Sequence, residues 1–246
     1  GSGTDTPVVK GLLKDIAELG DYVKYDTGTE KGVLTFRVLY NDDTNGLQII
    51  SDKNVDNVTL GGDDWTTGKD SYNNAIVTLN EAAYDYAENS LYAIDGRCVG
   101  SVPTVGADGT FTAKNTEEVG PFSDFKFTPS STIEGVNNMK DTDTNYVTDR
   151  TAMKAIGGDM WITGEYYWLA SRLVFSSSSS SCDFLMRIEA DSGGLNNYYA
   201  LCYVYSSGDS GGYSREYGLR PCISLRSDIK VTGGDGSEET PYELGI

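Results

Sequence analysis

A change of hydrophobic pattern near Trp161 is the feature that most constrains the fold of this chain. Before this point, apolar residues recur at helical spacing in several segments, whereas after it the apolar runs are short and typical of strands. Strand-like runs follow at 166–171, 183–189, 198–205 and 217–225. Helices first and a β-rich half afterwards predict an α+β fold. Since no linker or fixed-period repeat divides the chain, we expect a single domain over residues 1–246.

The first half is expected to mix helices with short strands. Helices are predicted at 8–19, 71–89 and 149–156. Strands are predicted at 21–25, 33–40 and 46–51, with a polar turn over 41–45. Gly20 is expected to end the first helix, and Ser71 and Thr148 are expected to cap the other two. We expect residues 98–147 to be irregular, and residues 1–7, which begin with a scar-like Gly-Ser-Gly, to be flexible.

The chain of 246 residues contains no histidine, and this absence removes several kinds of chemistry. A Ser-His-Asp or Cys-His nucleophile cannot form, and zinc or haem sites that need an imidazole are excluded. Lys plus Arg is 19 and Asp plus Glu is 37, which gives a net charge of −18. Because nucleic-acid binding depends on clustered cations, this charge argues against nucleic acid and against an anionic membrane as partners. No run of about 18 apolar residues is present, so we expect no membrane span.

Two short motifs resemble functional signatures without carrying their chemistry. Residues 208–212 spell the GDSGG of trypsin-like proteases, but no imidazole can take the proton of Ser210, and we interpret them as a glycine-rich turn. Residues 141–145 resemble the first half of an EF-hand loop, but Tyr146 replaces the required Gly and Ala152 the required Glu. A solvated acidic turn is favoured there, with a weak calcium site of another type as the alternative. We therefore assign no metal site, cofactor or catalytic residue.

The four cysteines are Cys98, Cys182, Cys202 and Cys222. They lack CxxC spacing, so a metal knot is not expected. Disulfides, in any of three pairings, and free thiols both remain open.

The most unusual composition lies in residues 171–217, which hold 12 Ser and 6 Tyr together with Gly and Asn. Tyrosine offers a large contact area at a low cost in rotamer entropy, and Ser, Gly and Asn give adaptable polar contacts, as in antibody paratopes. The alternative is a low-complexity polar loop. Because strand-like apolar runs interrupt the polar stretches, we favour a β scaffold that displays a polar and aromatic surface.

The flanks of this segment carry a resemblance to a known family. Residues 167–172 read YWLASR, and residues 217–225 read YGLRPCISL. This frame resembles the variable proteins of diversity-generating retroelements of bacteria and their phages. Near the N-terminus, the stretches GDYVKYD, FRVL and LQIIS are similar to the same group. The resemblance covers most of the chain and implies a C-type lectin-like fold of the formylglycine-generating-enzyme type.

In that family, mutagenic reverse transcription changes adenines of a template repeat, and the product overwrites the 3′ end of the gene. The varied side chains then lie on one exposed face of a rigid β scaffold. The resemblance implies a non-enzymatic binding protein of a phage virion or bacterial cell surface. Its partner would be a varied ligand, a protein or cell-surface molecule.

The resemblance also implies roles for individual positions within a variable region at 168–225. The implied scaffold positions are Trp168, Ser171, Arg172, Phe184, Arg187, Tyr217, Gly218, Arg220 and Pro221. Alternation along strands would point the intervening residues outward. The predicted binding face consists of Leu173, Phe175, Ser177, Ser180, Cys182, Asp183, Leu185, Asn196, Tyr198, Tyr199, Tyr203, Tyr205, Tyr213 and Arg215.

Two alternatives share the implied fold. A formylglycine-generating enzyme would need a cysteine pair that holds copper, together with structural calcium, and no matching pair is found among the four cysteines. A structural module of a phage particle, pilus tip or surface adhesin would lack a varied ligand. Enzymatic activity is not expected.

Overall fold

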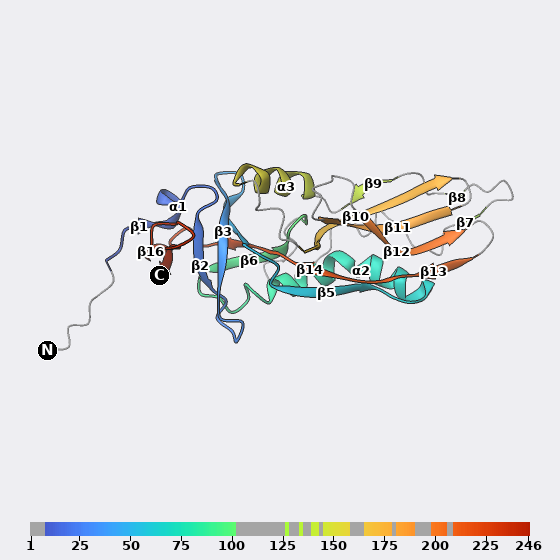
Figure 1. The fold of residues 1–246 in the computed structure, drawn as a ribbon, viewed down its shortest axis with the longest axis horizontal. Helices are drawn as coiled ribbons and strands as arrows, with labels where there is room; N and C mark the ends of the chain where they lie inside the picture. Colours follow the sequence, from blue (N-terminus) through green and yellow to red (C-terminus); the bar gives the residue numbers. More distant parts are fainter. Residues whose placement is uncertain are drawn as a thin grey trace.

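Most of the described residues lie in β-sheets. The computed structural model describes residues 8–101, 126–127, 133–134, 139–142, 145–157, 165–178, 181–189, 198–205 and 209–246. Over these ranges the chain is a mixed α+β protein, mostly β with few helices, as the sequence predicts. In Figure 1 the molecule is elongated, with the C-terminus at one end and strands β10 to β13 at the other.

A five-stranded sheet occupies the end of the molecule that carries the C-terminus (Figure 1). Its strand order is β2 (Tyr22–Asp26), β3 (Val33–Asp42), β4 (Gly46–Ser51), β15 (Pro221–Leu225) and β6 (Ala93–Cys98), and all neighbours are antiparallel. A three-stranded sheet, β1 (Gly11–Leu12), β16 (Lys230–Gly233) and β17 (Glu243–Gly245), joins the first described residues to the last.

A seven-stranded sheet forms the other end. Its main path is β13 (Ser210–Gly212), β12 (Tyr198–Tyr205), β11 (Ser181–Glu189), β10 (Tyr167–Ser178), β14 (Ser214–Leu219) and β5 (Asp56–Gly61). Strand β9 (Met139–Thr142) also pairs with β10, and β7 (Lys126–Phe127) and β8 (Ile133–Glu134) pair with each other. Only the β10–β14 pair of this sheet is parallel among the described strands.

Helix α2 (Trp65–Tyr84) packs against strands of both large sheets. The Asp64 side chain caps it by accepting a hydrogen bond from the Thr67 backbone N–H. Its apolar residues Tyr72, Ala75, Ile76, Leu79 and Ala83 are buried. Tyr72 and Trp65 contact the Phe184 ring edge-on, with ring centroids 5.5 and 5.9 Å apart. These contacts place one face of β11 in the core, so only the other face of this strand can carry a surface site.

Helix α3 (Tyr146–Ala155) is held by two buried ion pairs to two different sheets. Asp149 accepts two hydrogen bonds from the Arg97 guanidinium, at 2.6 and 2.9 Å. The next residue, Arg150, donates from Nε to Glu189 at 2.7 Å. Since Arg97 lies on β6 and Glu189 on β11, the helix ties the five-stranded sheet to the seven-stranded sheet.

The predicted helix over 8–19 is wrong. Only α1 (Leu13–Ile16) is helical there, and it follows strand β1. Backbone hydrogen bonds of 2.8 Å join Lys10 to Val231 and Leu13 to Ile229. This pairing with the C-terminal strand fixes Gly11 at a φ of 148°, which is incompatible with a continuous helix.

Both predicted N-caps are wrong as well. Helix α2 begins six residues before Ser71, whose hydroxyl instead accepts a hydrogen bond from Gly61 N–H at 2.6 Å. Helix α3 begins after Asn145 rather than after Thr148.

Several strand predictions need correction. The predicted 217–225 strand is two strands, β14 and β15, which belong to different sheets and are separated by the buried Arg220. Strands β5, β6, β16 and β17 were not predicted, and the segment 98–147, expected to be irregular, contains β7, β8 and β9. By contrast, β4 and β12 match their predicted bounds, and β2 is displaced by one residue. Strands β3 and β11 are each two residues longer than predicted, and β10 begins one residue later and extends to Ser178.

Candidate functional site

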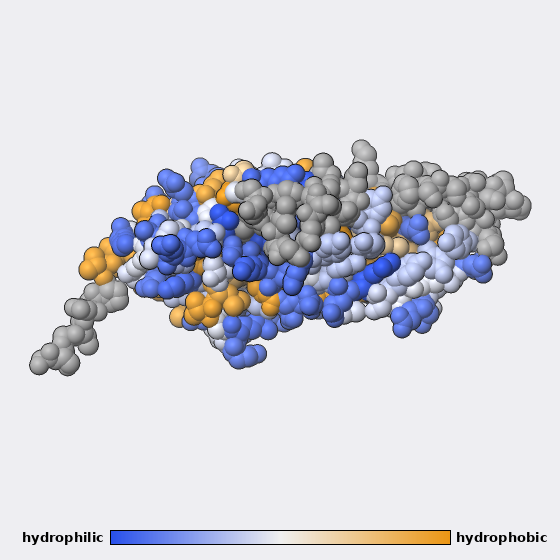
Figure 2. All heavy atoms as spheres, in the orientation of Figure 1, coloured by the Kyte–Doolittle hydropathy of each residue, from blue (hydrophilic) through white to orange (hydrophobic). Residues whose placement is uncertain are grey.

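A row of six tyrosines and one arginine runs along the seven-stranded sheet where β12, β13 and β14 meet. We call it the tyrosine ridge; it consists of Tyr166, Tyr199, Tyr203, Tyr205, Tyr213, Arg215 and Tyr217. Figure 2 shows that the end of the molecule carrying these strands is mainly pale, the colour of intermediate hydropathy, whereas the other end mixes strongly hydrophilic and hydrophobic residues.

The first part of the ridge is a stack with a guanidinium at its end. The Tyr217 ring lies 5.8 Å from the Tyr166 ring and 5.7 Å from the Tyr199 ring, which is stacked on it at 17°. The Arg215 guanidinium carbon lies 5.0 Å from the Tyr199 ring centre and 4.9 Å from that of Tyr213. Aromatic stacking and cation–π attraction therefore hold these side chains in place before any ligand arrives.

The second part is a group of three tyrosines, Tyr203, Tyr205 and Tyr213. The Tyr203 ring lies 5.1 Å from the Tyr205 ring and 5.3 Å from the Tyr213 ring, at interplanar angles of 57° and 37°. Tyr205 and Tyr213 are 42% and 41% exposed. The rings are thus fixed by one another yet open to solvent, which limits the entropy that a ligand must remove on binding.

A glycine makes room for the central ring of this trio. Gly211 lies directly opposite Tyr203 in the β12–β13 pair. A Cβ added to Gly211 would lie 2.5 Å from the Tyr203 hydroxyl oxygen and 2.7 Å from two ring carbons. The Tyr203 ring therefore lies across the β13 backbone, a position that any side chain at 211 would obstruct.

Asp183 is the acidic residue of this surface. It lies opposite Tyr203 in the β11–β12 pair, so the two side chains project from the same face of the sheet. Burial raises the pKa of the Asp183 carboxyl above its ordinary value. Burial also raises the pKa of the Tyr213 hydroxyl, and the neighbouring Tyr203, Tyr205 and Asp183 add to this while Arg215 opposes it. The Tyr213 hydroxyl is therefore neutral near pH 7 and available as a hydrogen-bond donor.

The structure gathers part of the predicted binding face. Tyr199, Tyr203, Tyr205, Tyr213 and Arg215 lie in the ridge, and Asp183 lies beside it. Leu173 and Tyr198 are partly exposed and lie outside the ridge. Ser180 and Asn196 fall outside the described residues. For Phe175 and Ser177 the structure describes only the backbone, within β10.

Two predicted members of the face, Cys182 and Leu185, are buried and need correction. Cys182 is 0% exposed and lies opposite Val204 on the core-facing side of β11. A register shift follows: Phe184 pairs with Cys202 but Leu185 with Ala200, which leaves Leu201 as an extra residue in β12. The extra residue lies in β12, and the register of β11 with β10 stays continuous from Asp183 to Leu185, so Leu185 shares the face of Asp183. It is nevertheless only 6% exposed.

The scaffold positions implied by the resemblance are mostly buried, and one belongs to the ridge. Every member of that set except Tyr217 is buried. Tyr217 packs against Trp168 at 4.9 Å on one side and against Tyr199 on the other. Sequence reasoning also missed Tyr166, although it stands just before the YWLASR frame. Tyr217 lies inside the tyrosine-rich segment 171–217, whereas Tyr166 lies five residues before it.

The four cysteines are free and buried. Burial raises the pKa of the Cys182 and Cys222 thiols to about 12 and also raises those of Cys98 and Cys202. Thiols held in the protonated form are poor nucleophiles and poor metal ligands. Among the described residues, no group of three or more Cys, Asp or Glu side chains is arranged to hold a metal ion.

The protease-like motif at 208–212 and the EF-hand-like motif at 141–145 lie only partly within the described residues. Ser210 is exposed at the start of β13, so Ser210, Gly211 and Gly212 form an edge strand and not the predicted turn. In the EF-hand-like segment, Asp141 and Thr142 end β9, and residues 143–144 fall outside the described ranges.

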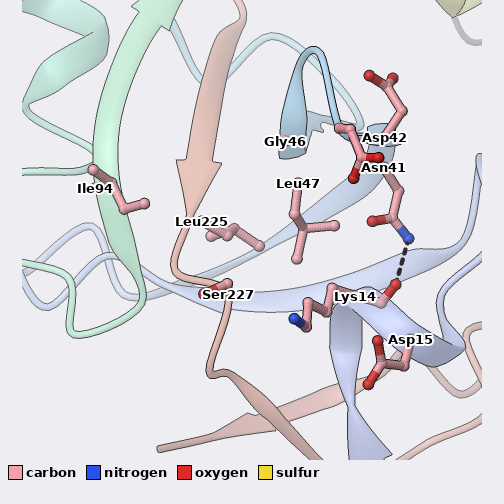
Figure 3. Close-up of a pocket in the computed structure, with 10 residues that line it drawn as sticks. Lys14, Asp15, Asn41, Asp42, Gly46, Leu47, Ile94, Leu225 and Ser227 are labelled. Carbon is pink, nitrogen blue, oxygen red and sulfur yellow. Dashed lines mark hydrogen bonds between the residues drawn. The ribbon is translucent and has the colours of Figure 1, made fainter.

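An open cavity of about 570 Å³ lies at the other end of the molecule, between α1, the β3–β4 turn and the ends of β6 and β15 (Figure 3). Leu47, Leu225 and Ile94 give it apolar walls. Asn41 Nδ2 donates to the Lys14 carbonyl oxygen at 2.9 Å, and Asp42 accepts from the backbone N–H groups of its own turn. The Asn41 amide and the Asp42 carboxylate are therefore already engaged in holding the α1 and β3–β4 segments.

The chain matches no family model, no curated protein and no solved structure. Within the part of the chain that the structure describes, no helix is long and apolar enough to cross a membrane.

Proposed function

We propose that this protein is a non-enzymatic binding protein that uses the tyrosine ridge as its contact surface. The observation that carries the proposal is the unbroken series of ring and guanidinium contacts that runs from Tyr166 to Tyr205. Exposed aromatic side chains and arginine supply most of the energy at protein interfaces when their positions are fixed in advance.

We further propose that the segment carrying the ridge is diversified by a retroelement, on a C-type lectin-like scaffold. The support is the YWLASR and YGLRPCISL frame, together with a tyrosine- and serine-rich segment between its two halves. Most of the residues that this frame fixes are buried, whereas Tyr199, Tyr205 and Tyr213 between its two halves are exposed to solvent. The ligand would be a protein or cell-surface molecule presented to a phage virion or bacterial surface.

The binding proposal is tested by removing the ridge without disturbing the core. A variant with Tyr199, Tyr203, Tyr205 and Tyr213 replaced by serine is compared with the wild type against a panel of purified bacterial surface proteins and whole bacterial cells. We expect the variant to lose binding at least about tenfold while it remains folded. A control variant replaces three exposed apolar residues outside the ridge by serine: Val33 on β3, Ile94 on β6, and Leu91 just before β6. Equal binding by wild type and ridge variant would contradict the proposal.

The diversification proposal has a separate test in the gene. A near-copy of the 3′ coding repeat that differs almost only at adenines, beside a reverse transcriptase gene, is expected. A flank without such a repeat would overturn diversification and leave the binding proposal in place.

A further inference from the structure

The three tyrosines at the end of the ridge form an unusual setting for a carboxylate. Tyr203, Tyr205 and Tyr213 are tilted against one another, so parts of their ring faces are open to solvent. Ring faces carry partial negative charge and attract cations. The Arg215 guanidinium already makes such a cation–π contact with the Tyr213 ring.

Asp183 adds a full negative charge to the same place. Its side chain stands beside Tyr203, and its charge acts on the Tyr213 hydroxyl. Among the described residues, the Asp183 carboxylate has no hydrogen-bond or ion-pair partner, although the residue is partly buried. A partly buried and unpaired carboxylate costs stability in the free protein, and a cation supplied from outside would remove that cost.

The charge of the whole chain favours the same sign of ligand. With a net charge of −18, the protein attracts basic molecules and repels acidic ones at long range. The neighbouring Arg215 cannot serve as the missing cation in the same way, because its guanidinium already lies between the rings of Tyr199 and Tyr213.

We propose that Tyr203, Tyr205 and Tyr213, together with Asp183, receive a basic side chain, arginine or lysine, from a partner protein. The rings would cover the apolar stem and one face of the cation, and Asp183 would accept its hydrogen bonds. This inference rests on the proposed function of the ridge and adds the chemistry of its ligand: a protein surface with an exposed basic residue.

The experiment titrates the full chain with single-residue probes. The probes are N-acetyl-arginine amide, N-acetyl-lysine amide and the neutral N-acetyl-citrulline amide, and NMR signals of labelled tyrosine rings report binding. We expect at least one basic probe to bind about tenfold more tightly than citrulline amide and to shift the rings of the trio. Asp183→Asn should remove this preference and Asp183→Glu should largely keep it. Asp43→Asn, which removes the same charge from an exposed turn, should leave the preference unchanged.

The outcomes distinguish the basic-ligand inference from the proposed function of the ridge. Equal binding of citrulline amide and both basic probes, or an Asp183→Asn variant with an unchanged preference, would overturn the basic-ligand assignment. If panel ligands still require the ridge tyrosines in that case, the proposed function stands without it. If neither the panel ligands nor the probes depend on the ridge, both fall. A difference between the arginine and lysine probes identifies which side chain the partner supplies.

Discussion

Gly211 and Gly212 are neighbours on β13, but a methyl group added to each would meet different kinds of atoms. At 211 the neighbour is the Tyr203 ring, a side chain that can turn away. At 212 the neighbours are the backbone carbonyl oxygens of Gly62 and Asp64, which belong to the segment that leads into α2 and cannot easily move. The first glycine therefore serves the ridge, and the second serves the fold.

This difference gives a prediction for a matched pair of variants. Gly211→Ala should cost less than about 1 kcal/mol of unfolding free energy but weaken ligand binding, because the Tyr203 ring is displaced. Gly212→Ala should cost about 2–3 kcal/mol, because the added methyl group forces the backbone apart. Urea denaturation measures the first quantity and titration with a panel ligand the second. Equal losses of stability in the two variants would contradict this assignment.

Asp183 gives a prediction about pH. Because burial raises its folded-state pKa, the folded chain keeps this proton to higher pH than the unfolded chain. The resulting stability is fully present below the unfolded pKa and is lost as the pH rises through the folded pKa. Without ligand, Asp183→Asn should therefore be more stable than the wild type at neutral pH, by less than about 1 kcal/mol after solvent screening. Urea denaturation at a series of pH values should show this advantage shrinking toward acidic pH; a constant or growing advantage would refute it.

At the scale of elements, helix α3 decides how the two large sheets are joined. Asp149 also accepts a hydrogen bond from the Tyr40 hydroxyl at 2.7 Å and one from Gly100 N–H at 2.8 Å, so its carboxylate links β3, the end of β6 and α3. Arg97, its ion-pair partner, is 3% exposed. Removing one member of such a pair leaves the other charge buried and unpaired.

We therefore expect Asp149→Ala to lower the unfolding free energy by about 3–5 kcal/mol. In a double-mutant cycle with Arg97→Ala, the double variant should lose less than the sum of the two single losses, because no charge is then left unpaired. Additive losses would show that the pair is not coupled. Removing the exposed Arg226–Asp228 pair is the control, and it should leave stability close to that of the wild type.

The elements also show what the sequence could and could not predict. Helix α2 and strands β4 and β12 could be predicted because burial of one or both of their faces leaves a local pattern of apolar residues in the sequence. The 8–19 segment has an equally clear helical pattern, but pairing of Lys10 and Leu13 with a strand more than 200 positions away overrides it. The bulge at Leu201 is likewise invisible in the sequence, and so is the burial of Leu185, which shares the face of Asp183 but is only 6% exposed. The amino-acid composition indicated a tyrosine-rich binding surface, whereas only the tertiary structure shows which tyrosine rings contact one another.

At the scale of the whole molecule, strands β12 and β13 and the C-terminus lie at opposite ends of the elongated fold, and β14 lies nearer the middle (Figure 1). Residues after β15 return through β16 and β17 to the three-stranded sheet, which also holds the first described residues. Strands β12 and β13 are therefore far from this end of the molecule. Under the proposed function, a ligand bound at these strands would leave the opposite end free.

This arrangement predicts how the site of attachment affects binding. A chain immobilised through a biotin added after Ile246 should bind a panel ligand with the affinity measured in solution, because the ridge then faces away from the support. A chain immobilised through a cysteine placed at the exposed Ser210 should lose most of its binding capacity, because β13 lies at the edge of the ridge. All four native thiols are buried, so the introduced cysteine is the accessible one. Surface plasmon resonance on the two supports makes the comparison. Equal capacity on both would mean that the ligand contacts a surface other than the tyrosine ridge.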